Sequence, residues 1–236
     1  MAYSDIDKPS DYFNTVLYSG TGTTQSVTGV GFQPDFVWIK GRNAALNNVL
    51  NDIVRGSEKT LFSNNTLAEY TDRGVSTFDS DGFTFSAAND GDTHDLGDNY
   101  VAWNWLAGGT ASSNSDGSIT STVSANTTSG FSIVSYAGNS SNATVGHGLL
   151  GTTPAMLIFK NRDSTEDWVS WHQGLGGADQ RIFLNLTDGK STAATQWNNT
   201  LPTSTVFSLG SSASSNSSGN DFIAYCFAEK KGFSKF

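Results

Sequence analysis

The chain contains an internal repeat, and this feature limits its architecture more than any other. Four blocks of sequence recur in the same order, and the distance between the two copies of a block changes only from 118 to 122 residues. The paired blocks are FNTVLYSG (13–20) with FSIVSYAG (131–138), QPDFVWIKGRN (33–43) with TPAMLIFKNRD (153–163), LFSNNT (61–66) with IFLNLT (182–187), and GDNYVAWNWLA (97–107) with GNDFIAYCFAE (219–229). Self-similarity over almost a whole chain indicates a tandem duplication.

Each copy has the pattern of an all-β sandwich. In YVAWNW (100–105) apolar side chains occupy both faces of a residue-by-residue alternation, as expected of a central strand with a layer on each side. Only 15% of the residues are charged, and the 25 glycines suit a chain with many turns. Each copy has room for about seven or eight short strands. We therefore predict an all-β protein of two tandem jelly-roll-like β-sandwich domains.

The repeat also sets the predicted domain boundaries. These are an N-terminal arm at 1–11, a first sandwich at 12–109, a linker at 110–117 and a second sandwich with a terminal strand at 118–236. The second copy opens with Gly-Phe-Ser at 130–132, and the same tripeptide recurs at 232–234. We therefore expect 233–236 to be the first strand of a third copy. Phe233 and Phe236 would belong to an assembly strand, paired with the second sandwich or with a neighbouring subunit.

The charge of the chain limits its partners. The formal charge is −9 and only 13 residues are Lys or Arg, so we expect no binding to nucleic acid or to an anionic membrane. The sequence has no run of about 18 apolar residues that would predict a membrane span. The Lys-x-Arg pairs at 40–42 and 160–162 are expected on a solvated sheet edge, with a grip on a sugar phosphate or carboxylate as the alternative.

The sequence lacks the common signatures of catalysis. The single cysteine, Cys226, excludes an internal disulfide, and no pair of histidines has the spacing of metal ligands. There are four glutamates, and the aspartates lie in turn-like contexts, which argues against the paired carboxylates of a glycosidase. GHGLLG (146–151) leads into a strand pattern instead of a helix, so it is not a dinucleotide-binding loop. We therefore expect no enzyme.

One loop is rich in carboxylates. Asp90, Asp92, Asp95 and Asp98 lie within NDGDTHDLGD (89–98) and could offer oxygen ligands to Ca²⁺. The corresponding loop of the second copy, SSASSNSSGN, has no carboxylate. A solvated turn is the favoured interpretation and a Ca²⁺ site is the alternative; no other cofactor is expected.

The six tryptophans divide into two groups. Three align with large apolar residues of the second copy, which favours packing: Trp38 with Ile158, Trp103 with Tyr225, and Trp105 with Phe227. The other three are the predicted exposed positions, where a sugar ring could stack: Trp168, Trp171 and Trp197.

Several strings of the chain resemble a tandemly repeated module of marine bacteriophage proteins of cyanophage or pelagiphage type. They are IDKPSDYFNT, GSITSTVSANTTSGFSIVSY, NATVGHGL, PTSTVFSLG and FIAYCFAEKKGFSKF. The resemblance implies a place in the virion, as a tail-fibre, receptor-binding or capsid-decoration protein without catalytic residues. It agrees with the β-sandwich prediction.

From this resemblance we expect a homo-oligomer that contacts other virion proteins and acts through assembly and surface recognition. A host surface glycan is a candidate partner. The alternative function is a carbohydrate-binding module of a phage adhesin or depolymerase.

Overall fold

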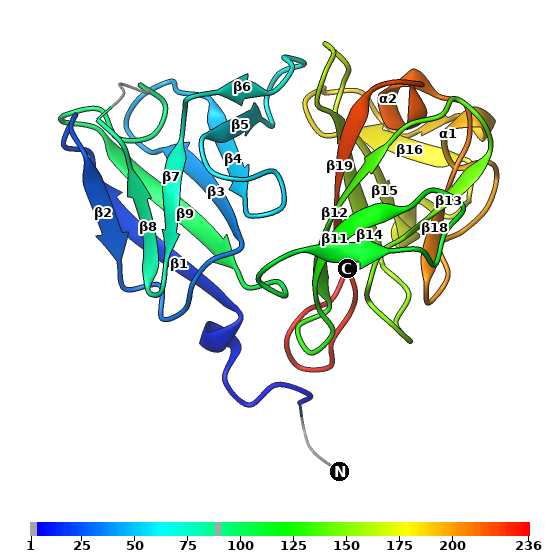
Figure 1. Ribbon diagram of the computed structural model, residues 1–236, viewed down its shortest axis with the longest axis horizontal. Coiled ribbons are helices and arrows are strands. Elements are labelled where there is room, and N and C mark those ends of the chain that lie inside the picture. The colour runs from blue at the N-terminus through cyan, green and yellow to red at the C-terminus, as the bar shows by residue number, and fades with distance from the viewer. Residues whose placement is uncertain (1–3, 88–90) are drawn as a thin grey trace.

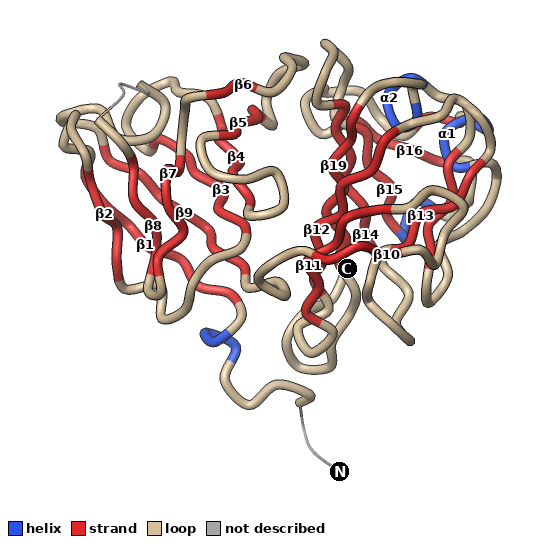
Figure 2. Tube along the Cα trace, in the orientation of Figure 1, coloured by secondary structure: helices blue, strands red, loops and turns tan. Residues whose placement is uncertain are grey.

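The chain folds into two β-sandwich halves that lie side by side (Figure 1). The computed structural model describes residues 4–87 and 91–236, and over these residues the protein is all-β with four sheets, none of them closed into a barrel. Loops connect the strands, and the helices are single turns (Figure 2). The predicted all-β class is confirmed.

The first half is a six-stranded sheet covered on one face by a three-stranded sheet. The large sheet has the antiparallel order β1-β9-β3-β4-β5-β6, and the small sheet has the order β2-β8-β7. The strands are β1 Phe13–Ser19, β2 Gln25–Thr28, β3 Phe36–Gly41, β4 Asn48–Asp52, β5 Lys59–Phe62, β6 Tyr70–Thr71, β7 Val75–Asp79, β8 Gly82–Phe85 and β9 Asn99–Trp105. Alternate residues, such as Val37 and Ile39 of β3, fill the core between the two sheets.

The second half is an eight-stranded sheet covered by a two-stranded one. Their orders are β10-β11-β12-β19-β14-β15-β16-β17 and β13-β18. The strands are β10 Ser112–Asn114, β11 Ser121–Asn126, β12 Phe131–Ala137, β13 Ala143–Gly146, β14 Met156–Asn161, β15 Val169–His172, β16 Gln180–Phe183, β17 Ser191–Thr192, β18 Val206–Leu209 and β19 Asp221–Phe227. The single-turn helices are η1 Pro9–Asp11, η2 Gln173–Leu175, α1 Ala194–Trp197 and α2 Ala213–Asn216.

The two halves share their strand order. From β12 outward the second large sheet reads β12-β19-β14-β15-β16-β17, which matches β1-β9-β3-β4-β5-β6 strand for strand, while β10 and β11 are added beyond β12. The register agrees too, because Phe13 lies opposite Trp105 and Phe131 lies opposite Phe227. Residues paired by the sequence alignment therefore occupy equivalent places in the two sheets.

Equivalent side chains also make the same hydrogen bonds. The Tyr18 hydroxyl donates to the carbonyl of Thr93 at 2.6 Å, and the Tyr136 hydroxyl donates to the carbonyl of Ser215 at 2.6 Å.

The two lysines of the Lys-x-Arg pairs bind the loop that follows their strand. Lys40 Nζ donates to the Leu46 carbonyl, and Lys160 Nζ donates to the Asn161 and Ser164 carbonyls. The expectation of a solvated edge is wrong for Lys160, which is completely buried.

The segment predicted as a linker is part of the second sheet. β10 lies within 110–117 and pairs with β11, and β11 forms the expected hairpin with β12. Asp35, at the start of β3, holds the connection from the other side, because its carboxylate accepts hydrogen bonds from the amides of Ala107 at 2.8 Å and Gly109 at 3.0 Å. The passage between the halves is thus fixed by hydrogen bonds and is not a free linker.

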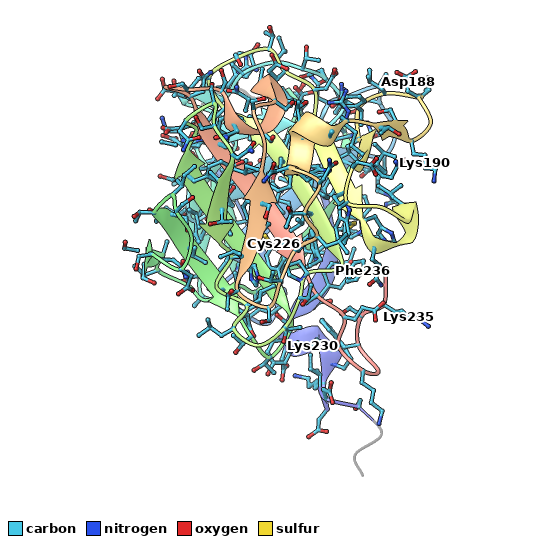
Figure 3. The ribbon with its side chains drawn as sticks, turned by 90° about the vertical axis from the view of Figure 1, so that its right-hand side faces the viewer. Asp188, Lys190, Cys226, Lys230, Lys235 and Phe236 are labelled. Atoms are coloured by element: carbon cyan, nitrogen blue, oxygen red, sulfur yellow. The ribbon has the colours of Figure 1, made fainter. Side chains whose placement is uncertain are left out.

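The prediction of a terminal strand at 233–236 is wrong. Residues 231–233 form a turn that is closed by an isolated bridge between Lys230 and Ser234. The two phenylalanines pack within the same chain, Phe233 edge-on against Tyr12 with ring centres 6.3 Å apart and Phe236 against Phe227 at 5.9 Å. These contacts cover part of each ring without a strand partner. Figure 3 shows Phe236 and its neighbouring lysines at the end of the molecule where the N-terminal segment also lies.

The N-terminal arm docks on this turn. The amide of Asp5 donates to the carbonyl of Lys231 at 2.9 Å, and Ile6 is buried. The two terminal segments therefore brace one another.

A hydrophobic cluster separate from the two sandwich cores lies between the halves. It predicts that the two halves stabilise each other. Phe36 is 1% exposed, and its ring centre lies 4.4 Å from that of Tyr225 and 5.9 Å from that of Phe131, both in the second half. We expect Phe36→Ala to lower the free energy of unfolding by about 3–5 kcal/mol, because it empties a site that both halves fill. Urea unfolding followed by tryptophan fluorescence measures this loss.

Leu17→Ala is the matched control, because Leu17 is on the same sheet but 63% exposed. We expect this control to change stability by less than about 0.5 kcal/mol. A Phe36→Ala protein as stable as the control would contradict the coupling of the halves.

Candidate functional site

The two large sheets meet face to face, and their junction is the most elaborate site of the molecule. Besides Phe36, it contains Trp105, whose ring centre lies 6.2 Å from that of Phe131 and 6.3 Å from that of Phe227. Offset and tilted rings at such distances attract each other beyond the effect of their buried area. The apolar faces of both sheets are thereby removed from water.

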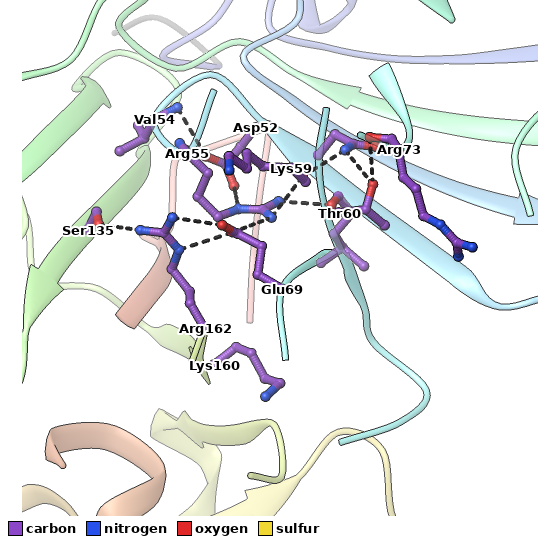
Figure 4. A network of polar contacts seen from close by, with 12 residues as sticks. Asp52, Val54, Arg55, Lys59, Thr60, Glu69, Arg73, Ser135, Lys160 and Arg162 are labelled. Atoms are coloured by element: carbon purple, nitrogen blue, oxygen red, sulfur yellow. Dashed lines mark hydrogen bonds and ion pairs between the residues drawn. The ribbon is translucent and has the colours of Figure 1, made fainter. Parts of the chain in front are cut away.

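A buried arginine of the first half, Arg55, lies beside this aromatic cluster, with its Nη2 3.4 Å from the Tyr225 hydroxyl. Figure 4 shows the polar network around it. The turn after β4 forms because the Asp52 carboxylate accepts hydrogen bonds from the amides of Val54 at 3.0 Å and Arg55 at 2.9 Å. This turn points the Arg55 guanidinium back onto the same carboxylate, with which it forms an ion pair whose two side chains are completely buried. Asp52 also accepts a hydrogen bond from the Tyr225 hydroxyl of the second half at 2.8 Å.

Glu69 extends the network across the junction. One of its oxygens lies 3.1 Å from Arg55 Nη1, and the two oxygens together accept a forked pair of hydrogen bonds from Arg162, at 2.8 Å from Nη2 and 3.0 Å from Nε. The backbone joins in, because the amide of Glu69 donates to the carbonyl of Arg162 at 2.8 Å. Two-point pairing of this kind fixes orientation as well as distance.

The charges in this network stabilise one another. Burial alone would raise the pKa of Glu69, but the hydrogen bonds from Arg162 and the charge of Arg55 outweigh it and hold that pKa below its ordinary value. Burial likewise opposes the charge of Arg55, and the attraction of Asp52 and the other acidic groups raises its pKa instead. Burial raises the pKa of Tyr225, so its hydroxyl stays protonated and donates to Asp52. The network is therefore a structural clamp with matched charges.

The tryptophans that were predicted to stack on sugars are all buried, so that prediction is wrong. Their indole N–H groups donate to carbonyls inside the protein: Trp168 to Phe62 at 2.8 Å, Trp171 to Gly177 at 3.2 Å, and Trp197 to Gln180 at 3.0 Å. The first of these bonds crosses the junction. Trp168 is thus a side chain of the second half that is buried against the first half.

The acidic loop is tied to its own half. Asp90 lies outside the described residues. The carboxylate of Asp92 accepts hydrogen bonds from Asn47, from its amide at 2.8 Å and from its side chain at 3.0 Å. The amide of Asp95 donates to the Tyr100 hydroxyl, and the amide of Asp98 donates to the Asp95 carbonyl. Within 4–87 and 91–236, no three His, Cys, Asp or Glu side chains gather closely enough to hold a metal ion. The described part of the loop therefore gives the Ca²⁺ prediction no support.

Two buried groups that resemble catalytic ones have structural roles. Burial lowers the pKa of Lys160 to about 8, and its ammonium is used by the two loop carbonyls. Burial raises the pKa of the Cys226 thiol to about 12, which keeps it protonated inside the second sandwich.

A groove with an uncharged lining opens between the two halves, at a place where the sequence predicts no site. It has a volume of about 320 Å³ and lies between the segment that follows β5 and the segment that follows β16. Its lining residues are Trp38, Asn48, Ser63, Asn64, Leu184, Asn185, Leu186 and Thr187. The alignment of the two halves contains one sign of this groove, because Asn48 takes the place of the much larger Trp168. The alignment follows from strand pairing, since Val49 lies opposite Ile39 and Val169 lies opposite Phe159.

The clamp generates a prediction about acid stability. We expect Glu69→Gln to lower the free energy of unfolding by about 3 kcal/mol at neutral pH, because it leaves two arginines short of a counter-charge. The folded-state pKa of Glu69 lies below its ordinary value of 4.5, so the unfolded chain takes up the proton first. The wild-type advantage should therefore be complete above that value and disappear as the pH falls below it. Urea unfolding at a series of pH values measures both effects.

Asp11→Asn is the control, because Asp11 pairs with Lys8 on the surface, where both side chains are more than half exposed. We expect it to change stability by less than about 0.5 kcal/mol at any pH. Equal behaviour of the two variants would show that the clamp contributes no stability.

Comparison with known proteins gives a family and no activity. No helix among the described residues is long and apolar enough to cross a membrane. No curated protein and no solved structure is significantly similar to the chain. The profile of one family, described as a domain of unknown function, DUF7483, matches residues 8–236. This match includes both sandwiches, the clamp and the groove, and the chain therefore belongs to the DUF7483 family.

Proposed function

We propose that this protein is a non-enzymatic structural protein of a bacteriophage virion, acting through assembly and surface recognition as a tail-fibre, receptor-binding or capsid-decoration component. The observation that carries the proposal is the clamp between the halves. A buried, charge-matched network and a shared aromatic cluster join two sandwiches into one rigid block. A unit of two firmly joined sandwiches suits a virion, because a virion must keep its shape outside a cell.

We further propose that the two halves arose by duplication of one jelly-roll-like module. The matched strand orders and the equivalent tyrosine hydrogen bonds support this origin. So does the backbone, because Asp35 and Ala155 donate in the same way to the carbonyls of Trp105 and Phe227, at 2.9 and 2.7 Å. Fused copies are a simple source of the repeated modules that long virion proteins use.

The chemistry of the described ionisable groups also favours a structural role. Arg55, Glu69 and Arg162 are engaged with one another, and Lys160 is engaged with backbone carbonyls. Groups used in this way hold the fold and are not available to move protons for a substrate. The resemblance of the sequence to phage modules then directs the structural role to a virion, where we expect a homo-oligomer in contact with other virion proteins.

Localisation tests the proposal. Phage particles should be purified on a density gradient and probed with an antibody raised against the recombinant chain, by immunoblot and by immunogold electron microscopy. We expect the protein to sediment with the particles and the gold to decorate one structure on them. Light scattering of the recombinant protein should give a mass that is at least twice 25.1 kDa.

A protein found only in the supernatant of lysed cells would contradict the virion assignment. A mass of 25.1 kDa at every concentration would contradict the homo-oligomer.

A further inference from the structure

The groove between the halves is built from equivalent segments of the two copies. Ser63 and Asn64 follow β5, and Leu184 and Asn185 follow β16 at the matching positions. We propose that this groove binds a neutral glycan, with one sugar ring lying on the indole of Trp38. The inference rests on the recognition part of the proposed function, but it depends only on the groove and is tested without particles.

Trp38 provides the apolar surface. It is partly exposed in the groove, and its ring lies against Phe36 at 6.3 Å and edge-on to Trp103 at 6.5 Å between ring centres. These neighbours hold the indole in place before any ligand arrives, which reduces the entropy lost on binding. The electron-rich face of an indole attracts the C–H groups of a sugar ring, as it attracts other positively polarised groups.

The polar groups around the indole have hydrogen-bonding capacity left over. Within the described chain, no partner is found for the side-chain amide of Asn48, the hydroxyl of Ser63 or the indole N–H of Trp38. Ser63 is only 3% exposed, and it lines the groove. A hydroxyl-rich ligand would replace water as the partner of these three groups.

The walls of the groove are fixed by a hydrogen-bond pattern that occurs in both halves. Asn64 Oδ1 accepts from the amide of Asn48 at 2.8 Å, and Asn185 Oδ1 accepts from the amide of Trp168 at 2.9 Å. Each asparagine also donates through Nδ2, Asn64 to Asn47 at 2.9 Å and Asn185 to Asp167 at 2.7 Å. The segments on either side of the groove are therefore held before ligand binding.

The uncharged lining of the groove favours a neutral ligand. None of its lining residues carries a charge, and the chain as a whole has a formal charge of −9, which disfavours sulfated or carboxylated sugars. The two exposed leucines, Leu184 and Leu186, add an apolar edge that a sugar can touch with its C–H face. A volume of about 320 Å³ accommodates one or two sugar rings of a longer chain.

Comparison with the second half shows why the space beside Asn48 is open. At the position of Asn48 it has Trp168, which fills the space beside it and donates to the Phe62 carbonyl of the first half. The small side chain of Asn48 leaves the corresponding space open. Replacing Asn48 by tryptophan should therefore close the groove with a residue that the fold already accepts at the equivalent place.

The test measures binding of neutral oligosaccharides to the full chain by isothermal titration calorimetry and by tryptophan fluorescence. The probes are cellotetraose, laminaritetraose, maltotetraose and chitotetraose, with a sulfated carrageenan oligosaccharide as the charged comparison. We expect saturable binding of at least one neutral probe, weaker binding of the sulfated one, and little change of affinity with salt. Trp38→Ala and Asn48→Trp should each weaken binding by about tenfold or more.

Leu17→Ala is the control, because Leu17 is an exposed residue of the same sheet and does not line the groove. It should bind within about twofold of wild type, well below the tenfold effect. Circular dichroism and urea unfolding of each variant separate loss of binding from loss of fold. The proposal is overturned if no neutral probe binds the wild type, or if the folded Asn48→Trp protein binds as well as wild type. Neither outcome would affect the virion assignment, which the particle experiment measures.

Discussion

The fold depends on how the charge of Arg55 is neutralised. A guanidinium that is completely buried must have counter-charges close by, since an unpaired ion inside a protein is strongly unfavourable. Asp52 supplies one from the same turn and Glu69 supplies a second, and both belong to the first half. The carboxylate of Glu69 pairs in turn with Arg162, so the charges of this network balance only when the second half is docked. The relative position of the two sandwiches is therefore set by these ion pairs and hydrogen bonds as well as by the connecting segment.

Much of the strand arrangement could be predicted from the sequence, because alternation and repetition are local signals. The pairing of FNTVLYSG with FSIVSYAG and of YVAWNW with its counterpart predicts equivalent strands, and β1 with β9 and β12 with β19 have matching registers. The junction could not be predicted in this way. Arg55 and Glu69 are 14 residues apart and Glu69 and Arg162 are 93 apart, and no periodic pattern connects such positions.

The wrong predictions have the same physical origin. The sequence predicts exposure for Trp168, because it is not among the tryptophans that align with a large apolar residue, yet the other half covers the indole and accepts its hydrogen bond. Gly-Phe-Ser at 232–234 repeats the tripeptide that opens the second copy, but Phe233 and Phe236 find aromatic partners in Tyr12 and Phe227 at a tight turn. For Trp168 and Phe233 the contact comes from a segment far away in the sequence. The local pattern of apolar residues predicts which side chains of a segment can be buried, but it does not predict which other segment covers them.

The two halves dock through positions at which their aligned residues differ. Asp52 has His172 at its equivalent position in β15, so the carboxylate of the clamp exists on one side only. Asn48 and Trp168 differ in the same way, and the larger residue fills a space in its partner while the smaller one leaves a groove. The differences at Asp52/His172 and Asn48/Trp168 give the junction its defined arrangement, and the groove beside Asn48 follows from the second of them.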